Sequence, residues 1–217
     1  MRLTACDLRC SYCDTAYAFR EGRKLDLDSV MERVHCQAAP FAKTRTTSRL
    51  PLVELTGGEP LLQRNSLALM TRLCDEQFVV LLETSGAHDI GSVDPRVHRI
   101  MDLKCPSSGE VGRNRWQNLP LLRPTDEAKF VIGTAEDYDW AKAQVTEHGL
   151  ASRCPILFSW AAPLTAAQLD SSLKAVPEGQ TPISRRDLAE RIIADALSVR
   201  FQVQMHKVIW APDARGV

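Results

Sequence analysis

Short runs of apolar, β-branched residues recur along the chain and alternate with segments of helical periodicity. The runs that predict buried strands are "LVELT" (52–56), "FVVLLET" (78–84), "RIMDL" (99–103), "AKFVI" (128–132), "PILFS" (155–159) and "RFQVQ" (200–204), with a shorter candidate over 1–4. Helical spacing is found over 28–38, 61–76, 136–148 and 184–197. Strands that alternate with helices are typical of parallel β-α units, so we expect an α/β fold.

Periodicity alone leaves two α/β architectures open, a partial β/α barrel and an open doubly wound sheet. In both architectures ligands gather where the parallel strands end. The segments that follow the predicted strands, which should carry the chemistry, are "ACDLRC", "GGEP", "SGAH", "KCPSSGE" and "WAAP". We therefore expect these loops to form one functional site.

The charge balance restricts the kind of partner. The chain carries 27 basic and 27 acidic side chains, which argues against a surface that binds nucleic acid or an anionic membrane directly. No apolar run approaches the roughly 18 residues of a membrane span, and the N-terminus lacks the apolar stretch of a signal peptide. No linker divides the sequence, so we expect a single domain over 1–217 that acts on a small molecule in the cytoplasm.

Three of the seven cysteines, Cys6, Cys10 and Cys13, are clustered with the spacing C-x3-C-x2-C. A structural zinc needs a fourth ligand, and the nearest His and Cys lie on the predicted helix over 28–38. A [4Fe-4S] cluster held by three cysteines leaves one iron open to another ligand, so we favour the cluster over zinc. The cysteines expected as small buried core residues are Cys36, Cys74 and Cys154.

An aromatic residue, Tyr12, precedes the last of the three cysteines, and this pattern resembles the signature of the radical S-adenosylmethionine (SAM) superfamily. Further motifs follow in order: "LTGGEPLLQ" (55–63), "LETSG" (82–86), "DLKCPSSGE" (102–110), "AKFVI" (128–132) and "FQVQMHKVIWAP" (201–212). Together they resemble the 7-carboxy-7-deazaguanine synthase family of the 7-deazapurine and queuosine pathway. The resemblance implies a partial, incomplete β/α barrel of the radical SAM type.

The resemblance also implies the cofactors. The three cysteines are expected to hold a [4Fe-4S] cluster whose open iron is chelated by SAM. The residues expected to contact SAM are Gly57, Gly58, Glu59, Ser85, Asp102, Leu103, Lys104, Ser159, Trp160, Ala161 and Ala162. Without the resemblance, Glu59 is interpreted as a first-turn helix residue and Lys104 as a salt-bridged surface lysine.

The implied substrate is 6-carboxy-5,6,7,8-tetrahydropterin, with Arg2, Thr56 and Pro212 at positions that contact it. A guanidinium at Arg2 suits the substrate carboxylate. Thr15 matches a position that binds Mg²⁺, although by itself it would be interpreted as an ordinary helix N-cap.

The implied reaction is that of a carbon–nitrogen lyase. A 5′-deoxyadenosyl radical abstracts hydrogen from C6 of the pterin, and the ring contracts with loss of ammonia to give 7-carboxy-7-deazaguanine. SAM is regenerated, an electron donor such as flavodoxin reduces the cluster, and the family suggests a homodimer. Two alternatives stay open: a glycyl-radical activating enzyme, and a non-catalytic iron–sulfur protein that transfers electrons.

Two segments depart from the family pattern or stand outside it. Relatives usually begin with a further N-terminal segment that joins the substrate pocket. Either the start of this chain is misassigned or the segment is absent, and we expect the chain to lack it. The polar, basic stretch over 41–50 is expected to be a surface loop.

Overall fold

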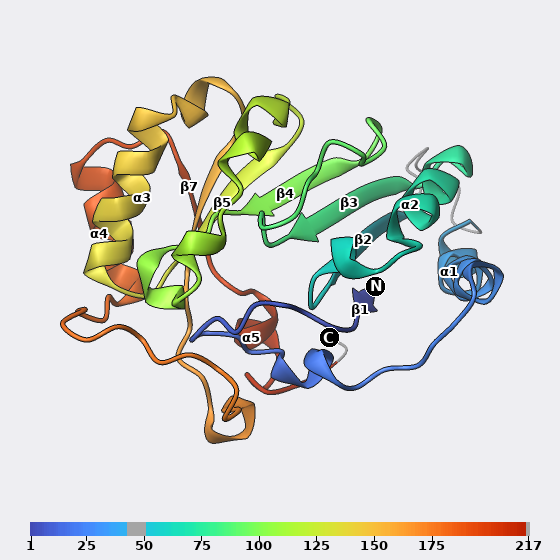
Figure 1. Cartoon of the computed structure of the whole chain (residues 1–217), viewed down its shortest axis with the longest axis horizontal. Helices are drawn as coiled ribbons and strands as arrows, with labels where there is room; N and C mark the ends of the chain where they lie inside the picture. The colour runs from blue at the N-terminus through green and yellow to red at the C-terminus, as the bar shows by residue number, and fades with distance from the viewer. Residues whose placement is uncertain (43–50, 216–217) are drawn as a thin grey trace.

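The computed structural model describes residues 1–42 and 51–215 and is built around a seven-stranded sheet. The strands are β1 (Arg2–Leu3), β2 (Leu52–Gly57), β3 (Val79–Thr84), β4 (His98–Asp102), β5 (Glu127–Ile132), β6 (Ile156–Trp160) and β7 (Arg200–Gln202). Every neighbouring pair is parallel, and the order in the sheet is the order in the sequence (Figure 1). A doubly wound sheet would reverse its strand order at a switch point. The sequential order therefore confirms the α/β fold with a partial β/α barrel.

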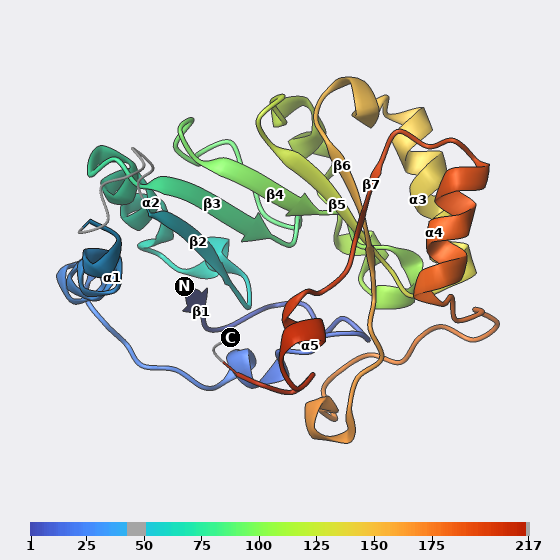
Figure 2. The same cartoon turned by 180° about the vertical axis from the view of Figure 1, so that it is seen from behind.

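Four helices connect the strands on the outer side of the curved sheet (Figures 1 and 2). They are α1 (Leu27–Ala42), α2 (Ser66–Asp75), α3 (Ala135–Glu147) and α4 (Arg185–Ala194). A short helix, α5 (His206–Ile209), follows β7 and lies beside the segment that follows β1 (Figure 2). The connection from β4 to β5 contains only the 3-10 turns η3 (Pro106–Ser108), η4 (Val111–Arg113) and η5 (Trp116–Leu121).

Alternation along the strands separates an apolar face from a polar face. In β5 the buried residues Ala128, Phe130 and Ile132 alternate with half-buried ones, including Lys129. The buried set packs against the helices: the ring centroids of Phe130 and Trp140 of α3 lie 6.2 Å apart, and Phe130 also lies 5.6 Å from Phe158 of β6. Burial of each such ring contributes about 2–3 kcal/mol. The half-buried set faces the other side of the sheet, where the cysteine loop lies.

Two helices are shorter than periodicity predicted. The segment predicted as helix over 61–76 begins with the 3-10 turn η2 (Pro60–Leu62), and α2 starts only at Ser66. The predicted helix over 184–197 ends at Ala194, because Ala196 takes a left-handed conformation (φ 48°). The Leu197 amide then donates to the Ile192 carbonyl at 3.2 Å, which terminates the helix in a Schellman motif.

The isolated cysteines follow the expectation at two of three positions. Cys74 and Cys154 are buried, as predicted. Cys36 is exposed, so its assignment to the core was wrong. It follows the buried Met31 by five residues in α1, and at 100° per residue this places it far from the apolar stripe.

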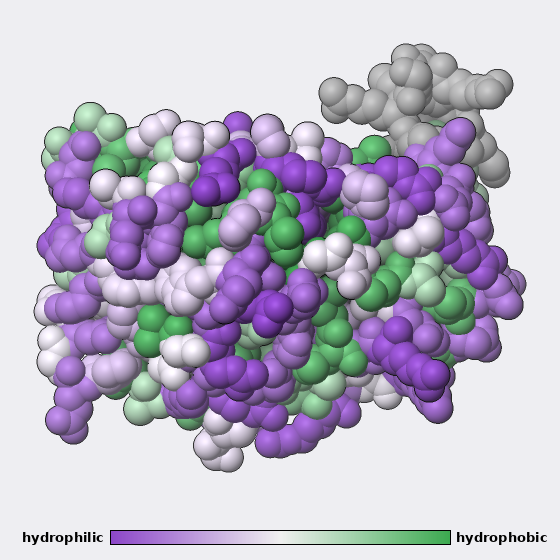
Figure 3. All heavy atoms as spheres, turned by 45° about the horizontal axis from the view of Figure 1, so that its top comes forward, coloured by the Kyte–Doolittle hydropathy of each residue, from purple (hydrophilic) through white to green (hydrophobic). Residues whose placement is uncertain are grey.

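Of the loop predicted over 41–50, residues 41–42 belong to α1 and the rest lie outside the described residues. None of the described helices has the length and apolar character needed to cross a membrane. Hydrophobic residues are interspersed among hydrophilic ones on the face shown in Figure 3.

Candidate functional site

The loop that carries the three cysteines crosses the carboxyl ends of the strands. It is attached to the end of β2, where the amides of Gly58 and Glu59 donate to the carbonyls of Leu3 and Ala5 at 3.0 and 2.8 Å. It is also attached to the loop after β4, where Ser11 donates through its amide and hydroxyl to residues 108 and 107. Segments far apart in sequence thus meet at one edge of the sheet, as the strand-end argument predicted.

The two glycines of "GGEP" are required by the chain's own backbone. A Cβ at Gly57 would lie 2.1 Å from the Leu3 carbonyl oxygen, and a Cβ at Gly58 would lie 2.0 Å from that of Ala5. Gly57 also has a backbone φ of 142°, which residues with a side chain rarely adopt. The absence of side chains at Gly57 and Gly58 therefore lets the cysteine loop approach β2. Contact between these glycines and SAM stays a prediction.

Glu59 is fully buried and joins β2 to β3. Its carboxylate accepts hydrogen bonds from the Leu61 amide (2.9 Å), the Thr84 hydroxyl (2.9 Å) and the Ser85 amide (2.7 Å). The bond to Leu61 caps η2, so Glu59 is the N-cap of a 3-10 turn and not, as interpreted without the resemblance, a residue of a helix's first turn. Three bonds from the protein fix the "GGEP" turn, and they also fix Ser85 at the end of β3.

The three thiols differ in burial. Cys10 is buried, whereas Cys6 and Cys13 are half-buried. Burial raises the pKa of the Cys10 thiol to about 11, against the opposing charge of Lys104, and burial likewise raises the pKa of Cys6. A metal centre would have to displace these protons on binding. Within the described residues no three His, Cys, Asp or Glu side chains converge on a single metal ion. In a cubane each cysteine binds a different iron, so its ligands do not share one ion.

A buried ion pair lies beside the thiols at the carboxyl end of β4. Lys104 is only 8% exposed, and its Nζ lies 2.8 Å from Asp102 Oδ2. Burial opposes a charge on Lys104, but the Asp102 carboxylate, together with Cys10, raises the pKa of its ammonium above the usual range. Lys104 is thus salt-bridged, but it is not a surface residue. Between the two, Leu103 is buried with its amide on the Lys129 carbonyl at 2.7 Å.

Three buried polar atoms near this edge have no partner within the described chain: Tyr12 Oη, Asp102 Oδ1 and Gln202 Oε1. Buried polar groups are normally paired, because desolvation without a partner is unfavourable. Two of these atoms accept hydrogen bonds and the third can donate one. SAM carries an ammonium group and ribose hydroxyls that can donate hydrogen bonds, and a carboxylate that can accept them. The two unpaired acceptors and one unpaired donor therefore fit such a ligand. Gln202 was missed in the sequence, where it lies in the middle of the strand predicted over 200–204; the observed β7 ends at it.

The four residues at the end of β6 that are predicted to contact SAM lie in different surroundings. Ser159 is buried on the polar face of the sheet, opposite Gln202 of β7. Trp160 packs against the core and donates from Nε1 to the Ile183 carbonyl at 2.9 Å. Beyond it, the Ala161 amide donates to the Ile132 carbonyl at 2.9 Å, and Ala162 is half-buried.

Thr56 belongs to a polar network on the inner face of the sheet. Its hydroxyl donates to Glu83 Oε2 at 3.0 Å, and Lys129 Nζ lies 3.0 Å from Glu83 Oε1. Burial would raise the pKa of Glu83, but the Lys129 charge lowers it overall, so this carboxyl is ionised at neutral pH. Glu83 and Lys129 were missed in the sequence, where the only signal was a single charged residue within each of the apolar runs "FVVLLET" and "AKFVI".

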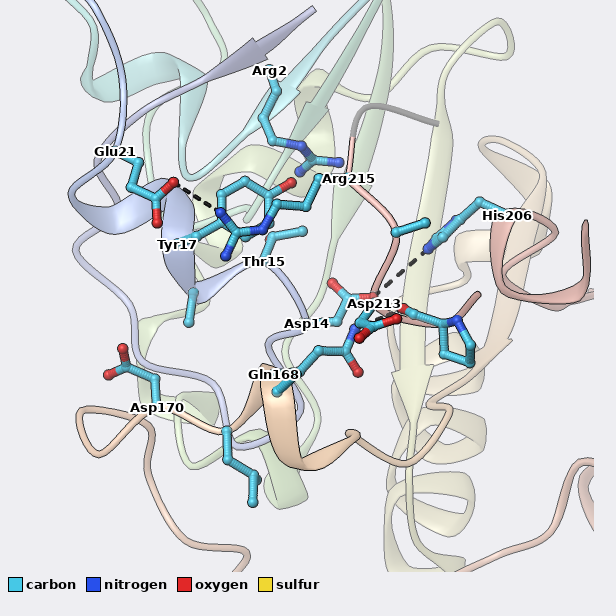
Figure 4. A pocket seen from close by; sticks show the side chains of 15 residues that line it. Arg2, Asp14, Thr15, Tyr17, Glu21, Gln168, Asp170, His206, Asp213 and Arg215 are labelled. Atoms are coloured by element: carbon cyan, nitrogen blue, oxygen red, sulfur yellow. Dashed lines mark hydrogen bonds and ion pairs between the residues drawn. The ribbon is translucent and has the colours of Figure 1, made fainter. Parts of the chain in front are cut away.

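Arg2, Thr15 and Pro212 line one cavity of about 330 Å³, which we name the Arg2 cavity (Figure 4). Arg2 has no carboxylate partner in the described chain; its Nη1 lies 3.4 Å from the Gly57 carbonyl. Thr15 occupies the N-cap position of η1 (Ala16–Phe19), but its hydroxyl makes no capping bond, so the N-cap interpretation fails for the side chain. Thr56 is not among the lining residues.

The other walls of the Arg2 cavity come from distant segments. Asp14 accepts from Gln204 Nε2 at 2.6 Å and lies 2.9 Å from Lys207 Nζ, which attaches the C-terminal segment to the cysteine loop. Gln168 Nε2 donates to the Pro212 carbonyl at 2.9 Å. These contacts join three parts of the sequence that no local pattern connects.

Comparisons with solved structures support the fold. The chain superposes on QueE from Escherichia coli with a TM-score of 0.60 at 20% identity, over 94% of this chain and 83% of that one. It superposes on Streptococcus suis SuiB bound to S-adenosylmethionine with a TM-score of 0.62 at 16% identity, over 93% of this chain but only 48% of SuiB.

Comparisons with sequences give the family. No protein-family model matches the chain. The chain is 41% identical over 220 residues to the 7-carboxy-7-deazaguanine synthase of Chlorobaculum tepidum, covering 100% of this chain and 87% of that protein. It is 40% identical over 219 residues to the synthase of the same name from Koribacter versatilis, covering 100% and 90%. Identity at this level over whole chains shows that the chain belongs to the 7-carboxy-7-deazaguanine synthase family.

Proposed function

We propose that this chain is a single radical SAM core domain that converts 6-carboxy-5,6,7,8-tetrahydropterin to 7-carboxy-7-deazaguanine with loss of ammonia. Membership of the synthase family supports the reaction. The observation that carries it is the meeting of three thiols, the Lys104–Asp102 pair and the Arg2 cavity at one edge of the sheet.

When bound, the [4Fe-4S] cluster and SAM supply the one-electron cleavage that yields a 5′-deoxyadenosyl radical. The chain's own part is to hold and orient these groups. Cys6, Cys10 and Cys13 would each bind one iron. The backbone from Gly57 to Glu59, the end of β4 over 102–104, Ser85, and the segment 159–162 would hold SAM.

Arg2 and Thr15 carry the proposed contacts to substrate and metal. The Arg2 guanidinium forms no ion pair with a carboxylate among residues 1–42 and 51–215, although its charge acts on Glu54 and Glu83, so it is available to a ligand carboxylate. The Thr15 hydroxyl would bind Mg²⁺, with water and substrate oxygens as the other ligands. Thr56, oriented by Glu83, and Pro212 would complete the substrate contacts.

The remaining partners follow from the same assignment. A low-potential one-electron donor such as flavodoxin would reduce the cluster, and two copies of the chain would form a homodimer. We place the enzyme in the cytoplasm, where its cysteines stay reduced.

Anaerobic reconstitution with iron and sulfide tests the function. We expect a reduced cluster whose electron paramagnetic resonance signal changes on addition of SAM, and formation of 7-carboxy-7-deazaguanine from the pterin without net loss of SAM. Cys13→Ala should abolish the SAM-dependent signal, whereas Cys36→Ala, on the exposed side of α1, should retain it. Accumulation of 5′-deoxyadenosine in step with product would contradict a regenerated cofactor.

The two alternatives lose support from the comparisons. A glycyl-radical activating enzyme acts on a protein, and an electron carrier needs no substrate, whereas the curated relatives are named as synthases. Turnover of the isolated pterin would separate the proposed function from both.

A further inference from the structure

The C-terminal residues return to the Arg2 cavity and place a second guanidinium on its wall. The Arg215 guanidinium lies over the Tyr17 ring, 4.2 Å from its centroid, and Nη1 lies 2.9 Å from Glu21 Oε2 (Figure 4). Arg215, Tyr17 and Glu21 all line the cavity together with Arg2. The two arginines are 213 positions apart in sequence, so only the fold brings them to one cavity.

The contacts with Tyr17 and Glu21 fix the orientation of the Arg215 guanidinium but leave some of its N–H donors free. A guanidinium has five N–H donors in a planar fork, and one nitrogen of Arg215 is paired. Its ion pair with Glu21 is exposed on both sides, at 57% and 60% of the two side chains. Ion pairs that are this exposed contribute little to stability, so the contact with Glu21 is easily exchanged for another carboxylate.

The other acidic groups of the cavity are mostly engaged elsewhere. Asp14 is bound by Lys207 and Gln204, and Asp170 accepts from Ser172 and lies 3.7 Å from Arg20. Asp213 is carried by the same C-terminal segment as Arg215. An entering anion therefore meets two guanidiniums, Arg2 without an ion pair among the described residues and Arg215 with an exchangeable partner, whereas the Asp213 carboxylate on the same wall opposes it.

We propose that Arg215 is a specificity-determining residue that, together with Arg2, binds the carboxylate of the ligand in this cavity. Tyr17 keeps the guanidinium flat against the wall, and Glu21 is its partner until a ligand carboxylate replaces it. The assignment rests on the proposed function for the identity of the ligand, a heteroaromatic carboxylate. It predicts discrimination between ligands that differ only in that carboxylate.

Paired ligands test this role without turnover. The reconstituted protein, with SAM and Mg²⁺, is titrated calorimetrically with 7-carboxy-7-deazaguanine and with 7-deazaguanine, which lacks the carboxylate. We expect Arg215→Ala to weaken binding of the carboxylated compound about tenfold and to leave the other compound unchanged. Glu21→Gln removes the competing carboxylate, so it should tighten binding of the carboxylated compound.

Arg200→Ala is the matched control, because Arg200 is also exposed (67% against 57% for Arg215) but lies at the start of β7, paired with Glu127. It should leave both affinities unchanged. Equal weakening of both compounds by Arg215→Ala, or no effect on either, would overturn the assignment while the proposed function stands. If the unmodified protein bound neither compound and did not turn over the pterin, the proposed function would fail and the Arg215 assignment with it.

Discussion

The "GGEP" turn shows how single residues can serve the fold and the site together. Gly57 and Gly58 are required because the cysteine loop passes too close to them for any side chain, and Glu59 receives three hydrogen bonds, one from η2 and two from the end of β3. A change in this turn is therefore expected to act first on stability and, through the cysteine loop, on the cluster.

Gly58→Ala should destabilise the protein by about 3 kcal/mol, because the new methyl group would overlap the Ala5 carbonyl and force the backbone to move. For a chain of this size the midpoint of thermal unfolding should fall by roughly 10 °C. Gly112→Ala is the control, since no other part of the described chain lies within 4 Å of the place where its methyl group would sit. Equal midpoints for the two variants would show that the contact at Gly58 is tolerated.

Glu59→Ala should lower the free energy of unfolding by about 3 kcal/mol or more, because three buried donors lose their acceptor. Glu59→Gln keeps the shape and one acceptor oxygen, so its loss should be smaller. Urea unfolding measures both, with Glu178→Ala, an exposed glutamate, as the control. A Glu59→Ala variant as stable as that control would disprove the claim that the three hydrogen bonds to Glu59 stabilise the fold.

Among the secondary structure elements, α3 depends on one buried carboxylate. Asp137 accepts from the amides of Ser107 (2.8 Å), Gly133 (2.9 Å) and Thr134 (3.2 Å), and forms a capping box with Thr134. It thereby connects the first turn of α3 to the end of β5 and to η3, which in turn bonds the cysteine loop. The helix start and the site thus share one anchor.

Asp137→Asn should destabilise the protein by about 2 kcal/mol, since an amide cannot accept at both oxygen positions. Hydrogen exchange should rise in the amides of 105–113, next to the cysteine loop. Asp139→Asn, two residues later on the exposed side of α3, provides the comparison. Unchanged exchange over 105–113 would mean that η3 does not depend on this anchor.

At the scale of the whole molecule, a buried charge network joins the amino ends of two strands, at the edge of the sheet opposite the candidate site. Asp126 is fully buried and pairs with Arg99 and Arg123, which connect the start of β4 to the turn before β5. Burial would raise the pKa of Asp126, but hydrogen bonds from the two arginines lower it to about 2. In the unfolded chain the pKa of this residue is about 3.9.

Because the folded pKa is the lower one, the ionised carboxylate stabilises the folded state above about pH 4, and this contribution is lost as the pH falls toward 2. We expect a loss of about 3 kcal/mol from this residue between pH 6 and the acid limit. Urea unfolding across this range should show a flatter pH dependence for Asp126→Asn, which is also less stable at pH 6. Asp75→Asn, at an exposed carboxylate, should keep the dependence of the unmodified protein.

Local residue spacing was sufficient to predict the strands, the cysteine motif and the loops that reach the site. The predicted strand over 78–84 is β3 within one residue, because apolar runs report burial directly. Periodicity was weaker at helix ends. It extended the last long helix past Ala194, because the left-handed residue that ends it carries an ordinary alanine side chain.

What a segment packs against is decided elsewhere in the chain. Periodicity shows that one side of a strand is polar, but the sheet register places Gln202 opposite Ser159, and the return of the C-terminal segment places Arg215 on Tyr17. The sequence predicts Glu59 as a SAM contact, and only the fold adds that β3 and the residue after it supply two of the three donors to its carboxylate. The physical reason is that a spacing pattern encodes which face of an element avoids water, whereas the identity of the neighbour on that face follows from strand order and crossovers between residues far apart in sequence.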